Sequence, residues 1–414
     1  MWSRIVRLLP RLLLAVLMAV ADRPYRKLDY TVNPTYQDQI DNEEGFPPQP
    51  TFSSTPESFV YGGIFSISDL EGNPLPDGYQ DVLSMQCAIA EVNRIAKERG
   101  ENTTFYYNIY NDQTNPAAAV RVATVLYSAG VPVTIGPTES DAASSVAALY
   151  ASFNSTIISG SATAVSLSDA SVYGSFFRTI PSDFNAADAI TDLMLYFNWT
   201  LVTPIYSRDQ FGLSGQQEFT SAAIAKGILQ TCGRVIPPGQ LTGLQSTINC
   251  LTSSQSTVVL LWMQASDAAA VISSFYNSTV LPSLTFIGPD SWGDLYGLQA
   301  YADDPFPSSY LEGTFGVVPR RGDQSNYVDC VSGLKATSES IPGFLDYWES
   351  SLKCLVDKDD DIPLCDQSIL DRPSFPNITC RCLPTDNLGL LNATVQPWGF
   401  SLSLDCVAQG ELHL

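Results

Sequence analysis

Four loops of the sequence carry side chains that could bind a small charged molecule. Residues 136–141 and 159–163 are rich in serine and threonine, whose hydroxyl groups and neighbouring backbone N–H groups can donate to a carboxylate. Phe211 offers an aromatic face, and Asp290 offers a carboxylate that can pair with an ammonium group. Donors for an anion together with acceptors for a cation are what a zwitterionic α-amino acid requires. The residue types therefore point to binding rather than to bond breaking.

Each loop also has a plainer interpretation when it is taken alone. Ser140 or Asp141 is a natural N-cap for the helix that follows. Residues 159–163 would be an ordinary polar loop, and Phe211 would be half of a hydrophobic staple at a helix start. The position of the loops favours a shared site, because each of them follows a predicted strand.

Strands and helices alternate along the chain from residue 59 onward, because β-branched and aromatic runs alternate with apolar residues at helical spacing. The strand at 257–262 is apolar throughout, as expected when helices cover both faces of a sheet. This alternation predicts parallel sheets wrapped by helices, in which ligands bind at the carboxyl ends of the strands. Strands are predicted at 59–65, 104–110, 131–135, 156–158, 201–206, 257–262 and 284–287, and helices at 78–98, from 116 with Asn115 as N-cap, and at 141–153, 184–197, 214–226, 265–276 and 344–354.

Composition limits the class of protein. The 414 residues are enough for two lobes of ordinary size, and 45% hydrophobic against 15% charged residues is typical of a folded globular chain. The net charge of −22 repels nucleic-acid phosphates, so no nucleic-acid partner is expected. The chain has one histidine, His413, and shows no nucleophile elbow, phosphate loop or metal-ligand cluster. We therefore expect neither an enzyme nor a cofactor nor a bound metal.

The N-terminus predicts export. A basic start and a short apolar run precede Ala19-Val20-Ala21, so residues 1–21 are interpreted as a signal peptide and 22–57 as a flexible leader. A membrane anchor is the alternative, although the run is shorter than the ~20 residues that span a bilayer. The chain is expected to be secreted or to lie on the extracellular side of the plasma membrane. Six glycosylation sequons agree with this route and begin at Asn102, Asn154, Asn198, Asn277, Asn377 and Asn392.

Nine cysteines in an oxidising compartment indicate disulfides, and the odd count leaves at least one free or paired with another chain. Cys87 is the candidate for a free buried thiol, because it shares an apolar helix face with Leu83 and Ala90. Cys232 and Cys250 are close enough in sequence to close a local loop.

In its motifs the sequence resembles the type I periplasmic-binding or Venus flytrap family, which includes the extracellular domains of class C G-protein-coupled receptors such as the metabotropic glutamate receptors. The resemblance covers roughly residues 58–355 and rests on the order and spacing of the motifs. They are Tyr61 to Phe65 (YGGIF), Asn111 to Pro116 (NDQTNP), Gly160 to Asp169 (GSATAVSLSD), Phe177 to Asp183 (FRTIPSD), Asn198-Trp199, Phe211 to Gly215 (FGLSG) and Ile287 to Trp292 (IGPDSW).

The resemblance implies a fold of two Rossmann-like α/β lobes joined by a hinge near Pro181, each a three-layer sandwich around a parallel sheet. Lobe 1 is expected over 58–182 plus 319–414, and lobe 2 over 183–318. The resemblance also implies dimers, with like or unlike chains, through the lobe 1 helices at 78–98 and 141–153. Attachment to a membrane is expected only through a further C-terminal segment, which the sequence up to Leu414 does not contain.

The family's amino-acid site falls on residues of this sequence one by one. Its carboxylate-binding serine and threonine fall on Ser140 and Thr163, its ammonium-binding aspartates on Asp183 and Asp290, and its ring tyrosine on Phe211, which lacks the hydroxyl. Ala162 and Asp81 are secondary positions.

Two departures bear on the ligand. Where the glutamate receptors place an arginine and a lysine on the ligand's side-chain carboxylate, this chain has Asp81 and Pro397. The expected ligand is therefore a neutral or basic amino acid and not glutamate. The same departures keep open a secreted decoy whose site has decayed, and a receptor guanylyl cyclase-type ectodomain is a further alternative.

Overall fold

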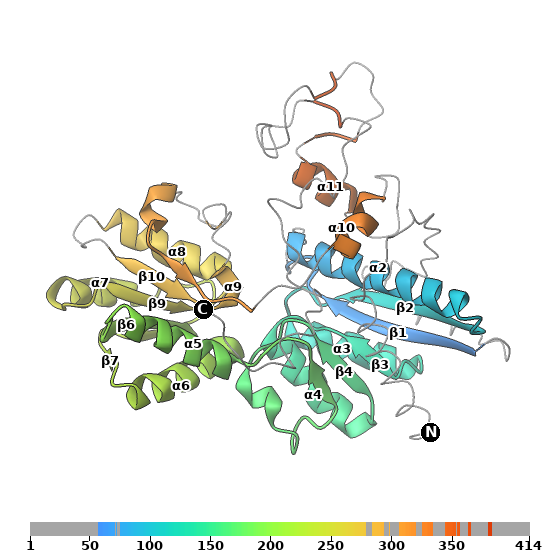
Figure 1. The fold of residues 1–414 in the computed structure, drawn as a ribbon, viewed down its shortest axis with the longest axis horizontal. Coiled ribbons are helices and arrows are strands. Elements are labelled where there is room, and N and C mark those ends of the chain that lie inside the picture. Colours follow the sequence, from blue (N-terminus) through green and yellow to red (C-terminus); the bar gives the residue numbers. More distant parts are fainter. Residues whose placement is uncertain are drawn as a thin grey trace.

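The computed structural model describes residues 57–70, 72, 75–278, 284–293, 298, 306–319, 325–333, 344–352, 354–356, 363–365 and 380–382. Its strands form two sheets, which lie in separate halves of the molecule (Figure 1). All the described strand pairs are parallel, as the alternation of strands and helices predicts. We call the elements around the five-stranded sheet the first lobe and those around the six-stranded sheet the second lobe.

The first lobe has helices on both faces of its sheet. Neighbouring residues of one strand supply two separate cores: Ile64 packs with α3 and α4, and Phe65 packs with α2 and α11. Strand order is β2-β1-β3-β4-β5. The elements are β1 (Glu57–Phe65), α2 (Pro76–Glu98), β2 (Thr103–Asn111), α3 (Pro116–Ser128), β3 (Val133–Ile135), α4 (Ser140–Phe153), β4 (Thr156–Ser159), the 3-10 helix η1 (Val165–Ser168), β5 (Phe176–Arg178), α10 (Ser325–Ser332) and α11 (Phe344–Leu352), with α10 and α11 lying against α2.

The second lobe repeats this three-layer arrangement. Leu261 packs with α7 and α8 on one face of the sheet, and its neighbours Leu260 and Trp262 pack with α5 and α6 on the other. Strand order is β11-β10-β9-β6-β7, with β8 paired to β6. The elements are α5 (Asp183–Tyr196), β6 (Leu201–Ser207), α6 (Gln210–Ala225), β7 (Leu229–Gln230), β8 (Arg234–Ile236), α7 (Leu244–Ser253), β9 (Val258–Trp262), α8 (Ala265–Asn277), β10 (Thr285–Gly288), α9 (Asp290–Gly293), η3 (Ser308–Leu311) and β11 (Phe315–Gly316).

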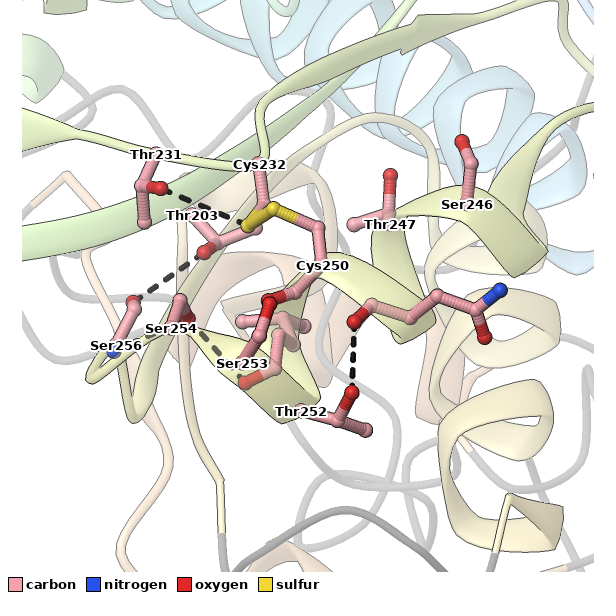
Figure 2. Close-up of a disulfide and its surroundings, with 12 residues drawn as sticks. Thr203, Thr231, Cys232, Ser246, Thr247, Cys250, Thr252, Ser253, Ser254 and Ser256 are labelled. Atoms are coloured by element: carbon pink, nitrogen blue, oxygen red, sulfur yellow. Dashed lines mark hydrogen bonds between the residues drawn. A yellow bond between two sulfur atoms is a disulfide. The ribbon is translucent and has the colours of Figure 1, made fainter.

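Disulfides confirm one cysteine prediction and overturn another. Cys232 and Cys250 are bonded and tie the segment between β7 and β8 to α7 (Figure 2). The prediction that Cys87 is a free thiol is wrong, because it is bonded to Cys330, 243 residues away. Its helix face is apolar, as predicted, but α10 covers that face and brings the second sulfur to it. Two further bonds are Cys354–Cys382 and Cys365–Cys380, and Cys406 lies outside the described residues.

The start of α4 also differs from the prediction. Asn115 caps α3 as expected, its side chain accepting from Ala117 and Ala118. Neither Ser140 nor Asp141 caps α4, because both lie inside the helix, which begins after Glu139. Their side chains instead have partners in other segments, described below.

Four of the six glycosylation sequons lie on described residues, whereas other predicted features do not. Asn102, Asn154, Asn198 and Asn277 are all exposed. The signal peptide at 1–21, the leader as far as 56, Asn377, Asn392, Pro397 and His413 lie outside the described residues. Within the segments that the structure describes, no helix is both long and apolar enough to cross a bilayer.

Candidate functional site

The five predicted ligand-binding residues lie just beyond the carboxyl ends of strands. Ser140, Asp183 and Asp290 are the first residues of α4, α5 and α9. Phe211 is in the first turn of α6, which starts four residues earlier than the predicted helix. Thr163 lies between β4 and η1. Parallel sheets bring such positions to one edge of each lobe.

Hydrogen bonds hold three of these residues around the loop that contains Thr163 and Ala164. The Ser140 hydroxyl accepts from the backbone N–H of Ala164 at 3.3 Å. The backbone N–H of Asp183 donates to the carbonyl of Thr163 at 2.9 Å. Ser140, Thr163 and Asp183 are thus held around the same loop, and all three are buried.

The loop itself is fixed by Ser159 and Arg178. The Ser159 hydroxyl donates to the carbonyl of Pro137 at 2.7 Å and accepts from the N–H of Ala162 at 3.0 Å. The Arg178 guanidinium donates to the carbonyls of Ala162 and Ala164 at 3.3 and 3.0 Å. The secondary position Ala162 is fully buried, so it serves the loop through its backbone.

Asp183 is a buried acid without a bonded partner. Its side chain is 1% exposed, and among the described residues neither carboxylate oxygen has a hydrogen-bond partner. Burial, and then the charge of Asp290, raise the pKa of Asp183 to about 7 against the opposing effects of Thr163, Ser214 and Arg178. The hydroxyls of Thr163 and Ser214 favour the charged carboxylate, but no described residue donates a hydrogen bond to either of its oxygens.

Asp290 is a partly buried acid of the second lobe, and its charge acts on Asp183. Burial raises the pKa of Asp290 to about 6, although N–H groups at the start of α9, from Asp290 itself and Ser291, lower it. The Ser291 hydroxyl donates to the carbonyl of Met263 at 2.8 Å and fixes this turn. Because Asp290 raises the pKa of Asp183, the two acids suit a ligand with a positive charge.

The Phe211 ring packs into the core of the second lobe. Its ring is 6% exposed and packs against Trp262, with centroids 6.2 Å apart. Among the described residues it makes no ring contact or hydrogen bond with the other four predicted residues. One turn further along α6, the Ser214 hydroxyl accepts from the N–H of Val165 at 2.8 Å, so the helix start touches the first lobe.

Further hydrogen bonds connect the lobes beside the site. Glu139 accepts from the Gln264 side chain at 2.8 Å, and Asp141 accepts from the N–H of Gln210 at 3.1 Å. The Gln210 side chain donates to the hydroxyl of Ser166 at 2.6 Å. Glu139 and Gln264 were not predicted from the sequence as site residues. Glu139 could have been found from its position, directly before Ser140 in a loop that follows a strand.

Asp81, the other secondary position, is 5% exposed on α2. Burial raises its pKa well above the usual range, and the charges of Asp77, Asp112 and Glu139 add to this. An acidic side chain therefore occupies this position, as the sequence indicated, and both its burial and the neighbouring acids favour its neutral form.

Comparisons with known proteins agree with this architecture. The sequence profile of the family described as "Receptor family ligand binding region" matches residues 80–357. The human protein named Taste receptor type 1 member 1 is 27% identical over 236 residues, which cover 52% of this chain and 28% of that receptor. The chain thus spans less than a third of the length of this relative. The profile covers well over half of the chain, and the two helix-covered parallel sheets are those expected of a Venus flytrap domain. The chain belongs to the receptor family of ligand-binding regions.

Proposed function

We propose that the chain binds an α-amino acid where its two lobes meet and that the bound ligand stabilises their contact. The ligand's carboxylate would accept from the hydroxyls of Ser140 and Thr163, and its ammonium group would lie between Asp183 and Asp290. The family and the geometry support a ligand-binding role, and the proposal adds the class of ligand.

The observation that carries the proposal is the Asp183 carboxylate, which is buried and whose two oxygens have no hydrogen-bond partner among the residues that the structure describes. Leaving a buried acceptor unsatisfied costs about 1–3 kcal/mol, and more when the group is charged. An ammonium group would offset this cost with charge-assisted hydrogen bonds. A cation beside the Phe211 ring would gain a further ~0.5–2 kcal/mol.

Closure of the lobes follows from the same placement. Ser140 and Thr163 belong to the first lobe, whereas Asp290 and Phe211 belong to the second. A ligand that contacts both lobes has differential affinity for the arrangement in which they touch, and so shifts the population toward it. We propose crossings between the lobes near residues 183 and 319, with a hinge near Pro181.

The wider setting is also a proposal. We infer a non-enzymatic, glycosylated extracellular domain with a cleaved signal peptide at 1–21, which dimerises through the first lobe. The exposed positions of the four described sequon asparagines support the glycosylation. Glutamate is not the proposed ligand, because its side-chain carboxylate would meet the buried acid Asp81 and its acidic neighbours where it needs a cationic partner.

A thermal-shift screen of the secreted chain against the common L-amino acids tests the proposal. A ligand at ~100 times its dissociation constant should add about 2.7 kcal/mol of stability. N-acetylated forms of the active amino acids are the matched controls, because they keep the carboxylate and lose the ammonium charge. Silence across the panel, equal effects of the acetylated forms, or a preference for glutamate would contradict the proposal.

A further inference from the structure

Three acids gather beside the proposed amino-acid site. Asp112 directly follows β2, and Glu139 lies between β3 and Ser140, so both stand at the carboxyl edge of the first sheet. Asp81 lies in α2, which packs on β1 and β2. We call Asp81, Asp112 and Glu139 the acidic triad. The same edge of the sheet thus holds the triad and the first-lobe half of the amino-acid site.

Asp112 is the most enclosed member. Its side chain is fully buried, and its Oδ1 accepts from the hydroxyl of Ser66 at 2.7 Å and from the N–H of Thr114 at 3.1 Å. Its Oδ2 is also buried and has no hydrogen-bond partner among the described residues. The Oδ2 atom can therefore accept a hydrogen bond from a donor that the described residues do not supply, such as a group of a ligand.

Helix packing holds Asp81 against the same segment. Gly78 lies one turn before Asp81 on the same face of α2 and touches Ser66, because a Cβ built on Gly78 would lie 1.9 Å from the Ser66 carbonyl oxygen. Only glycine permits this approach. The helix face that carries Asp81 is thereby pressed onto the residue whose hydroxyl holds Asp112. Asp81 is 5% exposed and makes no hydrogen bond or ion pair with a described residue.

Glu139 places the triad at the boundary between the lobes. Its Oε2 accepts from the Gln264 side chain of the second lobe at 2.8 Å. Burial raises the pKa of Glu139 to about 7, and the charges of Asp112, Asp209, Asp141 and Asp77 act in the same direction. A ligand held between the lobes would therefore meet Glu139.

Among the described residues, no cation balances the triad. The charges that act on Asp81 and Glu139 are all negative, and no lysine or arginine of the described segments acts on any of the three acids. Nor do these segments contain three His, Cys, Asp or Glu side chains grouped to hold a metal ion. An extended organic cation does not require ligands at coordination distance, and a guanidinium offers five donors to separate carboxylates.

We propose that the acidic triad binds the cationic side chain of the amino acid whose α-ammonium and α-carboxylate occupy the neighbouring site. The ligand class is then a basic amino acid with a guanidinium or ammonium side chain. This inference rests on the proposed function and narrows it. The orphaned Oδ2 of Asp112 and the unpaired Asp81 supply the acceptors, and Glu139 joins them when the lobes touch.

Paired ligands test the inference on the wild-type chain by isothermal titration calorimetry. L-arginine is compared with L-citrulline, which has nearly the same shape without the charge, and L-lysine with L-norleucine. We expect the charged ligand of each pair to bind at least 10-fold more tightly at pH 7.5. The preference should grow between pH 6 and pH 8, because Glu139 loses its proton over this range.

Variants then assign the effect to the triad. Asp81→Asn should reduce the preference for arginine over citrulline at least fivefold, because it removes an acceptor for the charged side chain. Glu98→Gln is the matched control, because it removes a charge from the exposed end of the same helix. If Asp81→Asn is not secreted, the paired ligands on the wild-type chain still decide the question.

The outcomes separate the two proposals. Equal affinities for arginine and citrulline would overturn the triad inference and leave the amino-acid site intact. No binding of any amino acid would overturn both. Calcium chloride that binds in the absence of amino acid and competes with arginine would show a metal site instead, and would also overturn the inference.

Discussion

Replacement of Asp183 by asparagine should stabilise the ligand-free protein at alkaline pH. The native carboxylate has a pKa of about 7 against 3.8 for the free side chain, because burial and Asp290 disfavour its charge. The raised pKa means that the folded state holds its proton more tightly than the unfolded state does. The stability from this group is full below pH ~4 and is lost as the pH rises through ~7.

The magnitude follows from the shift of 7 − 3.8 = 3.2 pKa units. At about 1.4 kcal/mol per unit, ionisation of Asp183 destabilises the folded protein by about 4 kcal/mol, of which about 2.5 kcal/mol falls between pH 5 and pH 8. Asparagine has almost the same shape and no charge. The free energy of unfolding of Asp183→Asn should therefore depend less on pH than that of the wild type, by about 2.5 kcal/mol over this interval.

Urea denaturation at pH 5 and pH 8, with disulfides intact and no ligand, measures this difference. The control is Asp192→Asn, which removes a charge from an exposed position of the same helix, where the partner is Lys226. Other raised acids, such as Glu139, contribute equally to all three proteins. The reasoning is refuted if Asp183→Asn retains the pH dependence of the wild type, or if the control loses as much of it.

Three further perturbations test contacts around the site. The double variant Cys87→Ala/Cys330→Ala opens a loop of 243 residues and should lower the free energy of unfolding by about 2–5 kcal/mol in urea; an unchanged midpoint would contradict this. Gly215→Ala puts a Cβ 2.3 Å from the buried Trp262 ring and should lower the free energy of unfolding by about 1–3 kcal/mol, with a change in tryptophan fluorescence. An unchanged free energy of unfolding would show that the ring can move aside. Gln264→Leu removes the bond between the second lobe and the acidic triad and should weaken ligand affinity about fivefold, or about 1 kcal/mol, by calorimetry; unaltered affinity would mean that the bond is absent in the bound state.

Local patterns predicted most of the regular elements. The Asn115 cap, the apolar strand at 257–262 and the helices at 78–98 and 265–276 depend on residues near in sequence, and the structure confirms them. The strands β5, β7, β8 and β11 were missed because two or three residues are too few to show a period. The helix α7 was missed because it follows Gly243, without a side-chain cap to announce it.

In the candidate site, the positions of the loops could be predicted from the sequence, but contacts between residues far apart in the chain could not. The loops were identified from their position after strands, a rule of topology that needs no contact information. The partners of Cys87 and Glu139 could not be identified, because Cys330 and Gln264 lie 243 and 125 residues away and no local pattern specifies such pairs. The role of Ser140 as a helix cap failed for this reason too, since its hydroxyl is used by Ala164, 24 residues further along the chain.

The acids at the junction of the lobes explain how one ligand could both bind and hold the lobes together. Asp183 and Glu139 have pKa values of about 7, so each is only partly charged in the free protein near neutral pH. A ligand cation beside either group lowers its pKa and recovers the charge that burial suppressed. Because Glu139 accepts from Gln264 of the second lobe, restoring its charge also strengthens a bond between the lobes. The ligand's positive charge would then both bind these acids and strengthen the contact between the lobes. A neutral ligand of the same shape would not ionise the acids and would strengthen that contact less.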